Sequence, residues 1–257
     1  MIQKLSNPMA VSHLFAGWEE TLIFSCLQGI MGDIYVPADV GGPESAAAYL
    51  GDFAFFAGIP SRELVLHRPD SHKQNFIIMV PQNEAWSRLL EECYGERAYR
   101  VSRYAIKKEP LIFNRTELQR NLLALPNDCE LRLIEEELYL KCLSQDWSRD
   151  LVSQFANYET YRRLGLGAVI VKAGEIISGA SSYSRYKEGI EIEIDTKEPY
   201  RRKGFAFICA SRLILECLDR GLYPSWDAQN IWSVALAEKL GYHYSHTYPA
   251  YEIRNAD

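Results

Sequence analysis

The stretch from Ile190 to Ala206 constrains the fold of this chain more than any other. Residues 190–196, Ile-Glu-Ile-Glu-Ile-Asp-Thr, alternate apolar and polar side chains, which is the period of a β-strand. Three cations and a glycine follow at 201–204, and an apolar helical pattern starts directly after them. Glycine lets backbone N–H groups approach a ligand closely, and a helix N-terminus attracts anions. The stretch therefore predicts a strand, a phosphate-binding loop and a helix, in that order.

The cation run Arg201-Arg202-Lys203 is either a solvated loop or a set of phosphate ligands. The chain has a net charge of −6, so the run stands out locally, and general binding of nucleic acid is not expected. The flanking strand and helix favour phosphate binding. The planar fork of arginine suits the geometry of a phosphate.

Composition bounds the class of protein. The chain has 257 residues, of which 47% are apolar, as expected for globular domains. Its six cysteines show neither Cys-x-x-Cys spacing nor a paired histidine, so we expect free thiols and no metal. No signal-peptide pattern follows the first residues, and the apolar run at 21–32 is too short to span a bilayer. The sequence predicts a cytoplasmic protein that does not contact membranes.

The second half of the chain alternates strands and helices. Glycine-containing turns at 173–175 and 187–189 join consecutive strands as hairpins, so this part of the sheet is predicted to be antiparallel. Strands are expected at 131–134, 167–172, 176–183, 190–196, 222–228 and within 242–253. Helices are expected within 136–164 and at 205–220 and 231–240.

Two domains are expected, 1–126 and 127–257. The first is a smaller mixed α/β domain that opens with a helix from about residue 8 to residue 30, and its residues indicate no chemistry. Its role is open. It is either a diverged copy of the fold of the second domain or a lid over the ligand site of that domain, because ligand clefts favour domain junctions.

Two segments at matching spacing resemble the GNAT superfamily of N-acetyltransferases. Residues 201–206 are similar to its loop Arg/Gln-x-x-Gly-x-Gly/Ala, and Asn-x-x-Ser-x-x-Leu-x-x-Lys-Leu-Gly-Tyr at 230–242 is similar to its second motif. Asp-Thr at 195–196 and Trp-Asp-Ala at 226–228 further resemble zwittermicin A acetyltransferase-type resistance proteins. The resemblance covers residues 129–254. It implies an α/β (α+β) fold, with a mixed, mostly antiparallel sheet flanked by helices, and acetyl-CoA as cosubstrate.

The resemblance also implies a coenzyme site. In the family the loop amides hold the coenzyme A pyrophosphate, and the preceding strand binds the pantetheine arm and the thioester carbonyl. The implied coenzyme-binding residues are Ile194, Asp195, Thr196, Arg201, Arg202, Lys203, Gly204, Phe205, Ala206, Asn230 and Ser233. Asn230 is equally suited to cap the last helix, because asparagine is a preferred N-cap residue.

Acetyl transfer to an amine requires a base, because an amine with a pKa near 10.4 is mostly protonated at pH 7. Alternation places Glu191, Glu193 and Asp195 on one face of the strand, and three isoleucines on the other. Glu193 is the first candidate for the base, Glu191 the second and Asp227 the third. The plain alternative is that these carboxylates form a solvated sheet face.

The chain departs from the family at Ala237, where many members have a tyrosine that protonates the departing thiolate. A thiol with a pKa near 8.5 leaves without strong help from an acid, so water is one substitute. Another tyrosine, such as Tyr183, Tyr186 or Tyr242, is a second substitute. The general acid therefore stays unassigned.

Three functions remain open from the sequence. The expected one is acetylation of a small, antibiotic-like amine, which suits the acidic balance of the chain. The alternative is a catalytically weak or inactive module that binds acetyl-CoA and regulates a partner. A protein acetyltransferase is less favoured, because nothing in the first half resembles a peptide-docking surface. An exposed C-terminal strand would allow pairing into a homodimer.

Overall fold

The computed structural model describes residues 1–38, 42–70, 72 and 76–254. They form two compact units. The first unit is Met1–Arg103 with Thr247–Asp257, and the second unit is Tyr104–His246. The division falls inside two strands, β6 (Ala98–Ile106) and β13 (Tyr244–Arg254). It therefore differs from the boundary expected between residues 126 and 127.

Helix α4 (Arg115–Leu122) explains why residues 104–126 belong to the second unit rather than to a connector. Leu118 is buried in the core of that unit. Asn121 Nδ2 donates a hydrogen bond of 3.1 Å to Ser211 Oγ on α7 (Phe205–Asp219), and Arg115 pairs with Asp219 at the end of the same helix. Because α4 docks on α7, the compact unit begins upstream of the predicted boundary.

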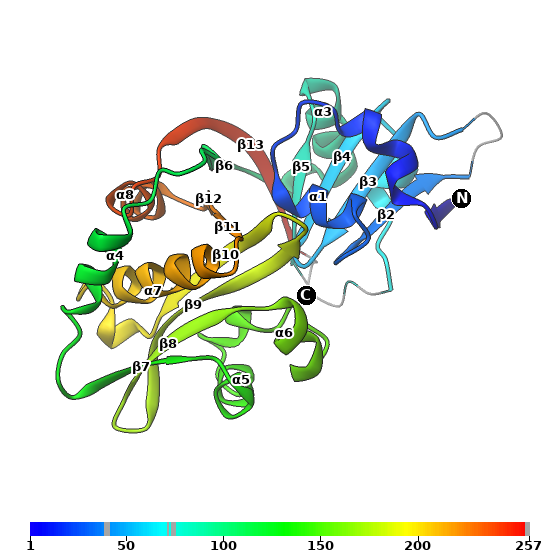
Figure 1. Ribbon diagram of the computed structural model, residues 1–257. Helices are drawn as coiled ribbons and strands as arrows, with labels where there is room; N and C mark the ends of the chain where they lie inside the picture. Colours follow the sequence, from blue (N-terminus) through cyan, green and yellow to red (C-terminus); the bar gives the residue numbers. More distant parts are fainter. Residues whose placement is uncertain (39–41, 71, 73–75, 255–257) are drawn as a thin grey trace. The chain divides into compact units, whose positions relative to one another are not determined.

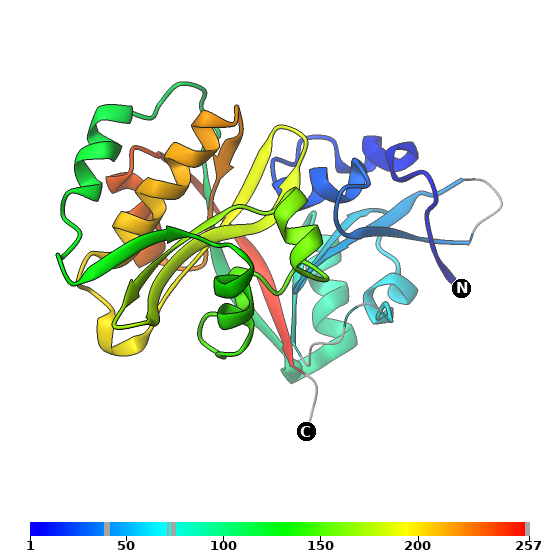
Figure 2. The same cartoon turned by 60° about the horizontal axis from the view of Figure 1, so that its bottom comes forward.

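The second unit is built on a sheet with the strand order β11-β10-β9-β8-β7. All neighbouring strands are antiparallel except β10 and β11, which are parallel. Figures 1 and 2 show α7 on one face of this sheet and α5 and α6 on the other. The other elements are β7 (Cys129–Leu133), α5 (Glu136–Leu143), η3 (Arg149–Leu151), α6 (Tyr158–Leu164), β8 (Gly167–Lys172), β9 (Glu175–Tyr186), β10 (Gly189–Thr196), η4 (Glu198–Tyr200), β11 (Tyr223–Ser225), β12 (Asp227–Ala228) and α8 (Ile231–Lys239).

The predicted fold class is confirmed: the sheet is mixed, mostly antiparallel and flanked by helices. The strand expected at 222–228 is divided at Trp226. Before this residue β11 pairs with β10, and after it β12 pairs with β6, where Asp227 lies opposite Ala105. The core lies between the sheet and α7, where Ile190 and Leu213 are fully buried.

The first unit has the strand order β1-β2-β3-β4-β5-β13-β6. Phe55 packs edge-on against Trp18, with 5.8 Å between ring centroids, and Phe56 lies against Trp86 at 5.3 Å on the opposite face. Its remaining elements are β1 (Ile2–Lys4), η1 (Pro8–Phe15), α1 (Thr21–Leu27), β2 (Asp33–Pro37), β3 (Ser45–Leu50), β4 (Phe53–Gly58), α2 (Arg62–Leu66), β5 (Phe76–Pro81), α3 (Glu84–Tyr94) and η2 (Gly95–Arg97).

The single helix expected from residue 8 to residue 30 is instead two short ones, η1 and α1. Gly17, between them, has a φ of +86°, a left-handed conformation that interrupts a right-handed helix. Proline at the start of η1 accounts for the predicted beginning.

The two units repeat one topology. In each, a first strand is followed by helical segments, three consecutive antiparallel strands, a helical crossover and a fifth strand parallel to the fourth. The parallel pair is β4–β5 in the first unit and β10–β11 in the second. The two crossovers differ greatly in length, since α2 has five residues and α7 has 15.

Candidate active site

Strands β10 and β11 pair over three residues only. Gly189, Ile190 and Glu191 lie opposite Tyr223, Pro224 and Ser225, and no described strand continues this ladder along β10. From Ile192 to Thr196, β10 pairs with β9 on its other edge. One edge of β10 is therefore without a strand partner among the described residues, over the segment that the sequence assigns to the pantetheine arm.

The loop from Arg201 to Gly204 joins this free edge to α7, and all four of its residues are exposed. Gly204 is the N-cap of α7 with a φ of +86°, and no side chain caps the helix. A Cβ atom added at Gly204 would meet nothing within 4 Å. The N-terminus of α7 thus has no side-chain cap and has open space beside Gly204, an arrangement that suits an anion.

The three cations of the loop differ in their contacts. Arg201 turns back to the end of β10, where its Nε donates to Thr196 O at 2.9 Å and its Nη2 lies 3.6 Å from Asp195 Oδ1. Lys203 Nζ lies 5.4 Å from the ring centroid of Tyr200. Arg202, with a φ of +61°, forms no ion pair with the described residues. Arg202 is thus the loop cation best placed to meet a phosphate.

The end of β10 is held by its own polar groups. Thr196 N–H donates to Asp195 Oδ1 at 2.6 Å, and the hydroxyls of Thr196 and Ser178 are hydrogen-bonded at 2.7 Å. Burial raises the pKa of Asp195, against the opposing effects of the Thr196 N–H and of Arg201. The backbone N–H of Thr196 is already hydrogen-bonded. Of the two residues Ile194 and Thr196, Ile194 therefore has the more available backbone N–H.

The predicted alternation along β10 is confirmed. Ile190 and Ile192 are buried in the core beneath α7, with Ile194 packed against it. The carboxylates lie on the other face, where Glu193 is opposite Ser181 of β9 and Glu191 is opposite Ser184. Their exposure differs: Glu191 is 7% exposed, whereas Glu193 and Asp195 are half-buried.

The face that carries the carboxylates lies beneath α6 and η3. Tyr161 of α6 reaches the sheet, where its hydroxyl lies 3.0 Å from Ser181 Oγ. Leu151 of η3 covers Gly179, the residue opposite Asp195. The carboxylates therefore do not form the solvated sheet face that was the plain alternative.

The two residues of the second motif make structural contacts. Asn230 caps α8, since its side chain accepts the Ser233 N–H at 3.0 Å, which confirms the predicted cap. Ser233 Oγ accepts a hydrogen bond of 3.0 Å from Trp226 Nε1. Asn230 is exposed and Ser233 is half-buried, so both lie near solvent at the start of α8.

The tyrosines suggested as proton donors are buried. Tyr242 donates to Pro224 O at 2.6 Å, and the Tyr186 hydroxyl is hydrogen-bonded to Ser225 Oγ at 2.9 Å. Burial is the main cause that raises the pKa of both phenols. Tyr183 is 6% exposed and Ala237 is fully buried. A raised pKa makes a phenol a weaker acid, so Tyr186 and Tyr242 are poor general acids.

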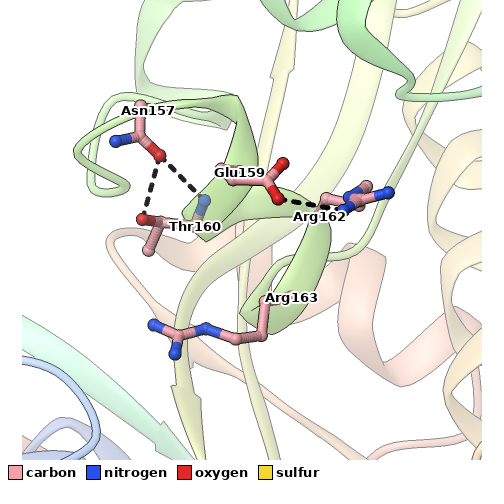
Figure 3. A pocket seen from close by; sticks show the side chains of 5 residues that line it. All are labelled: Asn157, Glu159, Thr160, Arg162 and Arg163. Carbon is pink, nitrogen blue, oxygen red and sulfur yellow. Dashed lines mark hydrogen bonds and ion pairs between the residues drawn. The ribbon is translucent and has the colours of Figure 1, made fainter.

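A hollow of about 660 Å³ beside α6 was not indicated by the sequence (Figure 3). Two of its polar groups are engaged with neighbours on the same helix: Asn157 accepts from Thr160, and Glu159 pairs with Arg162 at 2.9 Å. Figure 3 shows the Arg163 side chain extended away from this pair. In the sequence, the sign of this hollow is the pair of adjacent arginines at 162–163, which by themselves indicate the solvated end of a helix.

Within the described part of the chain, no group of three or more His, Cys, Asp or Glu side chains is placed to bind a metal ion. No helix in that part is long and apolar enough to cross a membrane. The cysteines are free thiols, and all but Cys93 are buried.

A sequence profile of the family described as GNAT acetyltransferase matches residues 12–251, which includes most of the first unit. A protein of Bacillus subtilis (strain 168), named uncharacterized N-acetyltransferase YdfB, is 28% identical over 173 residues. That alignment covers 64% of this chain and 61% of the relative, so the chain spans about three fifths of the length of this relative.

Solved structures give the same result. A GCN5-related N-acetyltransferase-like protein from Streptococcus suis 89/1591 is 49% identical, with a TM-score of 0.90, over 96% of this chain and 98% of that one. A tandem GNAT protein from the clavulanic acid biosynthesis pathway shares the fold, with a TM-score of 0.56 at 11% identity, over 100% of this chain and 99% of that one. From the family profile and the Streptococcus suis structure, this chain belongs to the GNAT acetyltransferase family.

Proposed function

We propose that this protein transfers an acetyl group from acetyl-CoA to the amine of a small molecule. Family membership supports acetyl transfer in general. The observation that supports a coenzyme site in this chain is the edge of β10 from Ile192 to Thr196, along which no described strand pairs. The chain runs from the end of this strand through η4 and the cation loop to the N-terminus of α7, which no side chain caps. An extended pantetheine arm can bond to such a strand edge, and a pyrophosphate suits such a helix N-terminus.

In this proposal the loop binds the pyrophosphate through backbone N–H groups from Arg202 to Ala206. The open space at Gly204 leaves room for the phosphates to approach the main chain. Arg202 adds a charged contact, while Arg201 keeps the end of β10 in place through Thr196 O. Asn230 and Ser233 remain candidates for contact with the coenzyme, in addition to their structural roles.

The coenzyme supplies an activated acyl thioester, and the protein supplies a base and a donor to the carbonyl oxygen. Deprotonating an amine with a pKa near 10.4 at pH 7 costs about 4–5 kcal/mol. Glu191 and Glu193, on the same face of β10, are the carboxylates placed to take that proton. A backbone N–H on the unpaired edge of β10, such as that of Ile194, stabilises the charge on the carbonyl oxygen.

The acceptor is proposed to be a small, antibiotic-like amine. One support is the likeness of Asp-Thr at 195–196 and Trp-Asp-Ala at 226–228 to zwittermicin A acetyltransferase-type proteins. Another is the shared fold with a tandem GNAT protein of clavulanic acid biosynthesis. The acidic net charge of −6 suits a cationic acceptor.

Calorimetric binding of acetyl-CoA tests the coenzyme site. Wild type should bind at micromolar concentration, and Gly204→Glu should weaken binding at least about 100-fold, because the new carboxylate repels the phosphates. Gly174→Glu is the matched control: Gly174 has a φ of +80° and open space around its Cβ position, but it lies in the β8–β9 turn. Binding that survives Gly204→Glu would contradict the proposal. A screen of amines for release of free coenzyme A thiol then identifies the acceptor.

A second candidate is a catalytically weak or inactive module that binds acetyl-CoA. It is favoured by Ala237 in place of the family tyrosine and by the burial of Tyr186 and Tyr242. This candidate predicts the same binding but no release of thiol with any amine. The screen therefore separates the two functions.

A further inference from the structure

Strand β7 forms one end of the sheet of the second unit, and no described strand pairs with its outer edge (Figure 1). It is the longest edge strand in the described part of the chain, with five residues, whereas β1 and β11 have three each and β12 has two. The C-terminal strand β13, which the sequence suggested for pairing, lies between β5 and β6 and is not an edge strand. Native proteins either blunt an open edge or pair it with another chain, so β7 is the edge to analyse.

The hydrogen bonds of β7 identify the main-chain groups that it presents outward. Directly after β7, Ile134 N–H donates to Gly167 O of β8 at 2.9 Å. In an antiparallel pair every second residue bonds to the partner strand, and the residues between them point their main-chain groups the other way. Counting back from Ile134, the second and fourth residues of β7 face β8, and the first, third and fifth face outward. The outward residues are Cys129, Leu131 and Leu133.

Two of the outward groups are already bonded within the chain. Cys129 N–H donates to Pro126 O at 3.0 Å, and Leu133 O accepts from Glu135 N–H at 3.1 Å. The outward groups that remain open, among the described residues, are both groups of Leu131, the N–H of Leu133 and the C=O of Cys129. Each open donor thus has an open acceptor of matching position on the same strand.

A second copy of β7, antiparallel to the first about a two-fold axis at Leu131, satisfies every one of these groups. Leu131 N–H of each copy donates to Leu131 O of the other, and Leu133 N–H of each copy donates to Cys129 O of the other. Such an interface is isologous, because the same strand serves both copies. The two groups that are bonded within the chain are the ones that this pairing does not need.

The same axis places opposite charges across the interface. Glu130 of each copy comes opposite Arg132 of the other, and pairs of this kind stabilise antiparallel strands. Glu130 is exposed and forms no ion pair with the described residues. Arg132 lies 3.7 Å from Glu137 of α5 with 39% of its side chain exposed, so it is accessible to a second copy. Shifting the register by two residues would place either Glu130 or Arg132 opposite itself, so charge selects the register centred on Leu131.

We propose that this protein forms a homodimer in which β7 pairs antiparallel with β7 of a second copy. The two five-stranded sheets of the second units then form one continuous sheet. The unpaired edge of β10 lies toward the opposite end of the strand order, so each copy keeps its own proposed coenzyme site. Pairing through one short strand buries little surface, so the dimer should dissociate on dilution.

Sedimentation equilibrium of charge-reversal variants tests the pairing. Wild type should approach twice the chain mass of 29.4 kDa at high concentration and return to 29.4 kDa on dilution. Glu130→Arg and Arg132→Glu should each weaken self-association about tenfold or more, because both cross-strand pairs become repulsive. An equal mixture of the two variants should associate again, because two arginines on one chain then meet two glutamates on the other.

Arg162→Glu is the matched control, since Arg162 is also exposed and pairs with a glutamate of its own unit, Glu159 at 2.9 Å, but lies on α6. It should dimerise like wild type. A wild type that stays monomeric up to millimolar concentration would overturn the proposal, as would a Glu130→Arg protein that self-associates as strongly as wild type. A mixture of the two β7 variants that fails to associate would reject the register.

Hydrogen exchange locates the interface within the chain. At concentrations where wild type is dimeric, the amides of Leu131 and Leu133 should exchange slowly, and in Glu130→Arg they should exchange fast. The amide of Arg132, which faces β8, should stay protected in both proteins and serves as the internal control. Fast exchange of Leu131 in a dimeric wild type would place the contact elsewhere and overturn the proposal. Acetyl-CoA binding should be the same in all of these proteins, so its loss would bear on the proposed function and not on the dimer.

Discussion

At the scale of the residue, the phosphate-binding loop shows that neighbouring cations have different functions. Arg201 donates to Thr196 O and lies 3.6 Å from Asp195, so it stabilises the end of β10. Arg202 has no ion pair with described residues and is exposed. Sequence alone treats the two as equivalent, because both match a pattern of cations before a glycine.

We expect substitution of the two arginines to have different effects, one on coenzyme binding and the other on the stability of the fold. Arg202→Ala should weaken acetyl-CoA binding about tenfold, because a charged hydrogen bond contributes about 1.5–3 kcal/mol, and leave Tm unchanged. Arg201→Ala should lower stability by about 0.5–1.5 kcal/mol, since it leaves the Thr196 carbonyl without its donor. Calorimetry and thermal unfolding of the two proteins check this. The opposite pattern would show that Arg201 is the phosphate ligand.

Asp195 should make the stability of the folded protein depend on pH in a definite direction. Its folded-state pKa is raised, mainly by burial, so the protonated form is the one that the fold favours. The stability that this provides is fully present below the unfolded pKa of about 3.9, and it is lost as pH rises through the folded pKa. Asp195→Asn should therefore unfold at higher temperature than wild type at pH 7, and the difference should vanish near pH 4. Unfolding curves across this range decide it, and a variant less stable at pH 7 would contradict the burial argument.

At the scale of the element, the order of strands and helices from residue 129 onward was predictable because turn residues and hydrophobic periods mark each element. The carboxylate face of β10 was predictable for the same reason. The shift in the β9–β10 register after Glu191 and the division of residues 222–228 at Trp226 were not predictable, because they depend on which strands pair. The sequence around Glu191 does not indicate its burial, and the sequence around Ser184 does not indicate that its buried hydroxyl has no hydrogen-bond partner among the described residues. Both arise because β9 and β11 lie on either side of β10.

At the scale of the whole molecule, one topology occurs twice, but among the described residues the two copies differ at the strand edge beyond the parallel pair. In the first unit the parallel pair continues past β5, where Gln82 N–H donates to Phe56 O at 3.1 Å and Gln82 Oε1 accepts the Gly58 N–H at 2.9 Å. Helix α2 has five residues, and the Ser61 side chain caps it. The first unit therefore repeats the fold without the edge and the long helix on which the proposed coenzyme site depends. The expectation of a diverged copy agrees with this repeat.

We therefore predict one acetyl-CoA per chain. Calorimetric titration should give a stoichiometry near one, and Gly204→Glu should abolish all of the binding rather than half of it. A second, Gly204-independent binding event would place a coenzyme site in the first unit. Titration with coenzyme A lacking the acetyl group is the control, since the loop is proposed to bind the pyrophosphate.

The position of β13 in the sheet of the first unit has a consequence for synthesis on the ribosome. Residues 251–254 of β13 pair with β5, so the sheet of the first unit lacks β13 until the end of the chain has been made. The other strands of that unit precede it in the sequence, and the last of them is β6. Translation at about 5–20 residues per second delays completion by roughly 8–35 seconds after β5 has emerged. During that time the outer edge of β5 can pair with other chains. A nascent chain stalled before β13 should therefore be more prone to aggregation than the full-length protein.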